Sequence, residues 1–88
     1  GYAFGQEHWG QGFARESMQR FINYCFTELE LRRLEARVDS RNSASSGLLQ
    51  RLGFGREGCL KEWMVEGDQP VDSLLFALLS REWGQTRR

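Results

Sequence analysis

The sequence has few of the residues that build metal sites or disulfide-rich folds, and it has no long apolar run. It contains two cysteines and one histidine in 88 residues. Two cysteines make no disulfide framework, and no Cys/His spacing resembles a zinc motif. No stretch is apolar for long enough to cross a bilayer, and no signal-peptide pattern occurs. We therefore expect a cytoplasmic protein without a structural metal.

The chain also lacks an excess of charge of either sign. Its 12 basic and 12 acidic side chains give a formal net charge of zero. Proteins that bind nucleic acids or membrane surfaces usually carry a basic excess, so we expect neither partner. The composition is 40% hydrophobic and 27% charged, which is typical of a globular chain. A length of 88 residues corresponds to one domain or part of one.

Hydrophobic periodicity predicts two helices. The first runs from about Gly12 to Leu29, where apolar residues recur at helical spacing. This apolar stripe consists of Ala14, Met18, Phe21, Ile22, Cys25 and Leu29. The second helix follows Asn42 or Ser43, either of which is a suitable N-cap, and ends before Gly53, a suitable left-handed C-terminal cap on which Phe54 packs back.

Four strands are predicted around these helices. They are Gly1–Phe4, Leu34–Val38, Phe54–Val65 (interrupted by Gly55 and Gly58) and Val71–Leu79. The turn Gly67–Pro70 should make the last two strands antiparallel. We therefore predict an α/β (α+β) fold with about four mixed strands and two helices. We assign no element to the tail from Ser80 to Arg88, which is polar apart from Trp83. The chain starts with strand-like residues and no initiator Met, so we expect further sequence before Gly1.

The stretch Trp9-Gly10-Gln11-Gly12-Phe13-Ala14 joins the first strand to the first helix. Its glycines let the backbone approach a ligand closely. The first N–H groups of a helix lack intrahelical partners, and the helix dipole adds positive charge, so such a turn suits a phosphate. A turn that serves only helix–strand packing remains an equally simple interpretation.

Two nucleotide-binding motifs fit this turn poorly. A P-loop would need Gly-Lys-Ser/Thr after the turn, and that sequence is absent. A Rossmann site would begin with Gly10-x-Gly12, and Asp39 follows the next strand where an acid would hold a ribose. The third small position is however Arg15, which blocks close helix–strand packing, and the chain has no room for a second nucleotide-binding half.

A second stretch favours a different ligand. Gly12 and Ala14 match the last two fixed positions of the acyl-CoA pyrophosphate loop of the GNAT acetyltransferase superfamily, which the turn resembles. Trp9 departs from the first fixed position, although aromatic residues are common there in the ribosomal-protein (Rim-type) branch. The segment 42–54, from Asn42 through Ser45 to Gly53-Phe54, is similar to the second signature of that family. The resemblance covers essentially all 88 residues, but only the C-terminal half to two-thirds of the family fold, whose first strands are missing.

The resemblance implies an acetyl-CoA site between two parallel strands that splay apart, Gly1–Phe4 and Leu34–Val38. The backbone of the first strand, including Phe4, would pair with the pantetheine arm. Backbone N–H groups of five consecutive residues would hold the pyrophosphate, namely Gln11, Gly12, Phe13, Ala14 and Arg15. Asn42 would bind the pantetheine arm or act as an N-cap, and Arg51 would approach the adenine or the 3′-phosphate.

The implied reaction is acetyl transfer from acetyl-CoA to a primary amine, possibly a protein N-terminus. Ser45 would protonate the leaving thiolate or serve as a capping hydroxyl. Glu7 and His8 are the nearest candidates for a base, and Trp63 would line the acceptor groove with Tyr2 and Phe4. An exposed sheet edge also predicts a homo-oligomer. The alternative is a non-catalytic remnant that acts as a CoA-binding or oligomerisation module.

Overall fold

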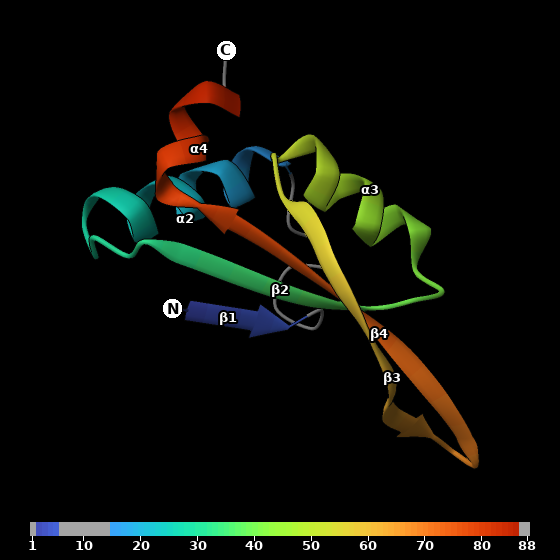
Figure 1. Ribbon diagram of the computed structural model, residues 1–88. Coiled ribbons are helices and arrows are strands. Elements are labelled where there is room, and N and C mark those ends of the chain that lie inside the picture. Colours follow the sequence, from blue (N-terminus) through green and yellow to red (C-terminus); the bar gives the residue numbers. More distant parts are fainter. Residues whose placement is uncertain (1, 6–14, 87–88) are drawn as a thin grey trace.

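The computed structural model describes residues 2–5 and 15–86, and in this part a mixed sheet carries three helices on one face (Figure 1). The strands are β1 (Tyr2–Gly5), β2 (Arg33–Asp39), β3 (Gly55–Glu66) and β4 (Gln69–Leu79), and the helices are α2 (Arg15–Thr27), α3 (Ser43–Arg51) and α4 (Ser80–Thr86). The strand order is β1-β2-β4-β3. The pair β1/β2 is parallel, and the other two pairs are antiparallel. The predicted mixed α/β class with four strands is confirmed, and the expectation of two helices is wrong.

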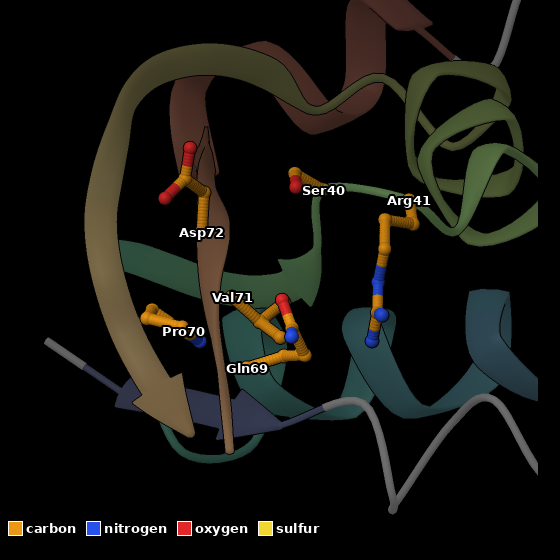
Figure 2. A pocket seen from close by; sticks show the side chains of 6 residues that line it. All are labelled: Ser40, Arg41, Gln69, Pro70, Val71 and Asp72. Atoms are coloured by element: carbon orange, nitrogen blue, oxygen red, sulfur yellow. The ribbon is translucent and has the colours of Figure 1, made fainter. Parts of the chain in front are cut away.

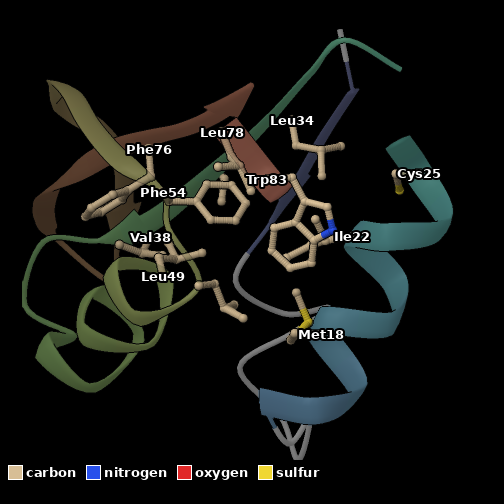
Figure 3. Packing of buried hydrophobic residues seen from close by; sticks show 12 residues of the cluster. Met18, Ile22, Cys25, Leu34, Val38, Leu49, Phe54, Phe76, Leu78 and Trp83 are labelled. Atoms are coloured by element: carbon tan, nitrogen blue, oxygen red, sulfur yellow. The ribbon is translucent and has the colours of Figure 1, made fainter. Parts of the chain in front are cut away.

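The core fills the space between the sheet and the helices (Figure 3). Strand β2 alternates as predicted, because successive side chains of a strand point to opposite faces. Its core-facing residues Leu34, Ala36 and Val38 are at most 1% exposed. Helix α2 contributes Met18, Ile22 and Cys25, three members of the predicted apolar stripe. Leu29 is 47% exposed, because α2 ends at Thr27 and the helical period no longer carries this side chain to the core.

Helix α3 begins and ends as its sequence predicts. Asn42 is the N-cap. Gly53 has a φ of +101°, the left-handed conformation that glycine adopts most easily. The Gly53 N–H donates to the Gln50 carbonyl and the Phe54 N–H to the Leu49 carbonyl, both at 3.0 Å, which satisfies carbonyls at the helix end. Phe54 is buried, so the predicted packing of this ring onto the core is confirmed.

Helix α4 corrects the prediction of a structureless tail. The Glu82 carboxylate accepts a hydrogen bond from the Leu79 N–H at 2.9 Å, as the third residue of a helix does in a capping box. Trp83 is 5% exposed, and its ring lies at a tilt to Phe26 with the centroids 6.4 Å apart. The buried ring of Trp83 and the capping hydrogen bond of Glu82 therefore stabilise a segment whose other residues are polar.

The hairpin of β3 and β4 has a shorter turn than predicted. Gln69 pairs with Glu66 and Pro70 with Val65, so the turn consists of Gly67 and Asp68. The register of β3 shifts between Arg56 and Gly58 and again between Leu60 and Met64. The first shift lies between the predicted interruptions at Gly55 and Gly58, and the second lies where no interruption was predicted.

Candidate functional site

The parallel pair of β1 and β2 brings the carboxyl ends of both strands to one edge of the sheet. All residues of β1 are paired with β2, from Tyr2 opposite Leu34 to Gly5 opposite Arg37. The predicted parallel arrangement is confirmed. The predicted separation of the strands is not found along Tyr2–Gly5, because inter-strand pairing holds this segment against β2 throughout.

The structure describes some of the predicted coenzyme-binding residues. Phe4 lies in β1, opposite Ala36. Gln11, Gly12, Phe13 and Ala14 lie outside the described residues, as do the candidate bases Glu7 and His8.

Arg15 and Arg51 lie together where α2 begins and α3 ends. The Arg15 Nη2 atom donates a hydrogen bond to the Arg51 main-chain oxygen at 3.3 Å. The predicted end of the pyrophosphate loop and the predicted phosphate-binding residue are therefore neighbours, although 36 positions separate them in the sequence.

Asn42 follows the carboxyl end of β2 and caps α3. Its side-chain Oδ1 accepts a hydrogen bond from the Ser45 N–H at 3.0 Å, and its own N–H donates to the Asp39 carbonyl at 2.9 Å. The capping role that the sequence predicts is confirmed. The cap uses the oxygen of the Asn42 amide, so the role of the amide nitrogen as a ligand donor stays a prediction.

Ser45 and Ser46 occupy the first turn of α3. Ser45 is 6% exposed and lies on the buried side of the helix. The Ser46 hydroxyl is also inaccessible, and it has no hydrogen-bond partner within the part of the chain that the structure describes. Sequence reasoning singled out Ser45 and missed Ser46, because a run of similar polar residues does not reveal which hydroxyl lacks a partner.

Arg41 joins the end of β2 to the end of β3. Its guanidinium contacts Asp39 Oδ2 at 2.6 Å and Glu66 Oε1 at 3.0 Å. Hydrogen bonds from the Arg41 side chain and then from its backbone N–H lower the pKa of Asp39 from 3.8 to about 2. The Asp39 carboxyl is thus a charged anchor at neutral pH, and the acid suggested for a ribose is already bound to Arg41.

A polar hollow of about 290 Å³ lies beside this ion pair (Figure 2). It is lined by Ser40, Arg41, Gln69, Pro70, Val71 and Asp72. The Ser40 N–H donates to the Asp72 carbonyl at 2.9 Å, which joins the end of β2 to the start of β4 across the hollow. Asp72 was not predicted as a site residue. The feature of the sequence that could have identified Asp72 is an acidic side chain within the predicted strand Val71–Leu79, whose residues are nearly all apolar.

Trp63, predicted to line an acceptor groove, lies within an irregular part of β3. Between Leu60 and Met64 this strand has more residues than the facing strand. Glu62 lies in this bulge with a φ of +51°, and its N–H donates to Asp72 Oδ1 at 2.8 Å. Trp63 follows, is 53% exposed, and stacks with the Arg37 guanidinium 5.5 Å from the ring centroid.

Arg37 faces away from the core, since it alternates with Ala36 and Val38 along β2. The Trp63 ring therefore lies on the sheet face opposite the helices and is not a core residue. Arg33 marks the same face near the other end of β2, where its Nη2 contacts Glu57 at 2.6 Å and the hydrogen bond lowers the pKa of Glu57.

Over the described ranges, 2–5 and 15–86, no group of acidic, histidine or cysteine side chains is arranged to hold a metal ion. Nor is any helix in these ranges both long enough and apolar enough to span a bilayer.

Comparison with known proteins gives one consistent family. Residues 1–55 match the family model described as an acetyltransferase (GNAT) domain. The Bacillus licheniformis protein named uncharacterized N-acetyltransferase p20 is 43% identical over 83 residues, which is 94% of this chain and 47% of that protein. The ribosomal protein uS5-alanine N-acetyltransferase of Escherichia coli is 34% identical over 83 residues, which is 94% of this chain and 43% of that enzyme.

The fold is also similar to solved structures. Spermidine/spermine N-acetyltransferase SpeG from Vibrio cholerae aligns with a TM-score of 0.80 at 29% identity, over 93% of this chain and 49% of that one. The chain thus spans about half the length of the curated relatives and solved structures that it matches.

Proposed function

Because the chain belongs to the GNAT acetyltransferase domain family, we propose that it is the C-terminal, acetyl-CoA-binding portion of an N-acetyltransferase domain. The observation that carries this proposal is the convergence of two elements at one edge of the sheet. The parallel β1–α2–β2 unit brings the carboxyl ends of β1 and β2 to the same edge, where open α/β sheets bind their ligands.

Each part of coenzyme A has a proposed partner at this edge. Backbone N–H groups from Gln11 to Arg15 bind the pyrophosphate, since they precede or start α2 and benefit from its dipole. The Asn42 amide nitrogen donates to the pantetheine arm. The backbone of β1, the edge strand of the described sheet, pairs with that arm as a further strand would. Arg51 lies next to Arg15 and contacts the nucleotide end.

The proposed reaction is direct acetyl transfer. A neutral amine attacks the thioester carbonyl, backbone donors stabilise the oxyanion, and the C–S bond breaks to release the coenzyme A thiolate. The Ser45 hydroxyl is the proposed proton donor to that thiolate and regains a proton from solvent. The second candidate is the hydroxyl of the neighbouring Ser46, which has no partner among the described residues. The amine loses its proton to solvent or to a base outside the described residues.

The acceptor that we propose is a protein N-terminal amine, as in the Rim-type branch. The 34% identity to the uS5-alanine N-acetyltransferase supports this choice. A polyamine is the second candidate, because the fold also aligns with spermidine/spermine N-acetyltransferase. The non-catalytic alternative also stays open, since relatives have about as much sequence again. We further propose a homo-oligomer, which sedimentation of the chain would test.

Titration calorimetry with acetyl-CoA, followed by an assay of thiol release, tests the function. The acceptor panel pairs an alanine-terminated peptide with spermidine. Gly12→Val should abolish binding if the turn approaches the pyrophosphate closely. Gly84→Ala is the matched control, because a Cβ at Gly84 would meet no atom within 4 Å. Binding without turnover would favour the non-catalytic module, and no binding would exclude the coenzyme site.

A further inference from the structure

Three residues of β3 face a single residue of β4. Leu60 pairs with Ser73 and Met64 with Val71, so the segment 61–63 stands opposite Asp72 alone. A simple bulge sets two residues against one, and this bulge contains one residue more. Because the regular pairing of the two strands is interrupted here, other contacts must define the conformation of the segment.

The Asp72 carboxylate supplies such a contact. The N–H of Glu62, the middle residue of the three, donates to Asp72 Oδ1 at 2.8 Å. The Asp72 main chain is held in turn, because its carbonyl accepts from the Ser40 N–H at 2.9 Å. Ser40 directly follows β2, and both Ser40 and Asp72 line the hollow in Figure 2. Asp72 therefore ties the bulge of β3 to the end of β2.

The backbone of Glu62 is strained. Its φ of +51° is unfavourable for any residue that has a Cβ. Glycine would adopt this conformation without strain, and β3 contains glycine at positions 55 and 58 but not at position 62. Strained residues persist where their surroundings hold them, and they are concentrated at functional sites. The strain at Glu62 and the carboxylate that holds it therefore point to a role for the side chain that follows, Trp63.

Trp63 lies close to the proposed coenzyme edge. The Arg37 guanidinium lies over its ring, 5.5 Å from the centroid. Arg37 pairs with Gly5, the last residue of β1, so the ring is near the carboxyl ends of both parallel strands. It lies on the sheet face opposite the helices, whereas the proposed pyrophosphate contacts are at the start of α2. An acceptor on the Trp63 face could thus reach the thioester from the side that the phosphates do not occupy.

We propose that Asp72 is a positioning residue for the acceptor, an inference that rests on the proposed function. Its carboxylate fixes the Glu62 backbone, and this backbone fixes the Trp63 ring against Arg37. Arg37 covers one side of the ring, and the exposed remainder contacts the peptide that carries the amine. Asp72 touches neither ligand, so its whole effect on acceptor affinity passes through Trp63.

Titration calorimetry with an alanine-terminated peptide, at saturating coenzyme A, tests this role without requiring turnover. Trp63→Ala should weaken peptide binding about tenfold, the effect of losing one aromatic anchor. Asp72→Ala should weaken it by a similar or smaller factor and leave the affinity for coenzyme A unchanged. The double variant should bind the peptide no more weakly than Trp63→Ala, because Asp72 acts only through the ring. Losses that multiply in the double variant would overturn the positioning role.

Three further variants separate this role from a loss of charge or of folding. Asp72→Asn keeps an oxygen that accepts from the Glu62 N–H, so it should bind the peptide as wild type does. Asp68→Ala is the matched control, since it removes the same side chain from the turn of the same hairpin and should leave the affinity unchanged. Asp72→Val removes the oxygens but favours a strand, so it replaces Asp72→Ala if circular dichroism shows that the alanine variant is unfolded.

Nuclear magnetic resonance follows the position of the ring itself. Wild type and Asp72→Asn should show nuclear Overhauser contacts between the Trp63 ring and the Arg37 side chain, and Asp72→Ala should lose them. Retained contacts in Asp72→Ala would overturn the positioning role. Unchanged peptide affinity in that variant would do the same while the coenzyme site stands. If the wild-type chain binds neither coenzyme A nor the peptide, the proposed function and the positioning role are both overturned.

Discussion

Asn42 and Ser45 are joined by a hydrogen bond in which the Asn42 side-chain oxygen accepts from the Ser45 N–H at 3.0 Å. The same asparagine is proposed to contact the coenzyme through its amide nitrogen. The two ends of one amide group are therefore assigned to two different tasks, one of folding and one of binding. This division can be tested, because the two ends can be changed separately.

Asn42→Asp keeps an oxygen acceptor at the N-cap and replaces the amide donor. We expect the free energy of unfolding to change little, since Asp and Asn are similar N-caps. Acetyl-CoA affinity should fall, because a carboxylate cannot donate to the pantetheine arm. Asn42→Ala should lower both, with a loss of stability of about 1 kcal/mol. Urea unfolding and calorimetry measure the two quantities, and wild-type affinity in Asn42→Asp would leave Asn42 with the capping role alone.

Trp83 attaches α4 to the rest of the fold. Trp83→Ala should destabilise the chain by about 3–5 kcal/mol, because it leaves a large cavity in the core. Trp83→Phe keeps a ring but removes the indole N–H, which donates to Asn23 Oδ1 at 3.2 Å. We expect it to cost about 1–2 kcal/mol. Urea unfolding followed by circular dichroism measures both variants. A loss below about 1 kcal/mol in Trp83→Ala would contradict a structural role for α4.

Glu62 has a backbone conformation that glycine adopts without strain, with a φ of +51°. Glu62→Gly should therefore be neutral or should stabilise the chain by up to about 1 kcal/mol. Lys61→Gly is the matched control, because Lys61 precedes it in the same strand and is not among the residues with positive φ. It should destabilise by about 0.5–1 kcal/mol. Thermal unfolding distinguishes the two, and equal losses for both would mean that Glu62 is not strained.

Asp39 makes stability depend on pH in the acid range. Its pKa is about 2 in the folded chain, against an ordinary 3.8. The unfolded chain therefore takes up this proton first as the pH falls, so the stabilisation is complete above about pH 4 and is lost between about pH 4 and pH 2.

Urea unfolding of wild type and Asp39→Asn across this range should show the loss. The difference in unfolding free energy should shrink as the pH falls, and salt should reduce it because Arg41 is partly exposed. A difference that does not change with pH would show that another group controls acid unfolding.

Local signals predicted most of the fold. The alternation around Ala36, the N-cap Asn42 and the C-terminal cap Gly53 each depend on neighbours within a few residues, and the structure confirms all three. Helix α4 was missed because it depends on Trp83, whose burial comes from contacts with a helix 60 positions away. Long-range packing of one residue leaves no periodic pattern in a sequence.

The residues of the candidate site also separate into those that local sequence predicts and those that only long-range contacts define. Asn42 and Arg51 lie in the segment 42–54, which is similar to a family signature, so both were predicted from the sequence. Arg41 and Asp72 were not, because their roles arise from pairing between β2, β3 and β4. The contact between Arg15 and Arg51 was likewise unpredictable, since only the packing of α2 beside α3 brings them together.

The strand order β1-β2-β4-β3 has a consequence for the sequence of events in folding. The β3–β4 hairpin closes a turn of two residues, Gly67 and Asp68, and such hairpins form within microseconds. Pairing β1 with β2 requires closure of a segment of about 30 residues, which is entropically costlier and slower. The edge that carries the proposed coenzyme site is therefore expected to assemble after the hairpin, and a ligand bound there would stabilise pairing that the hairpin does not itself require.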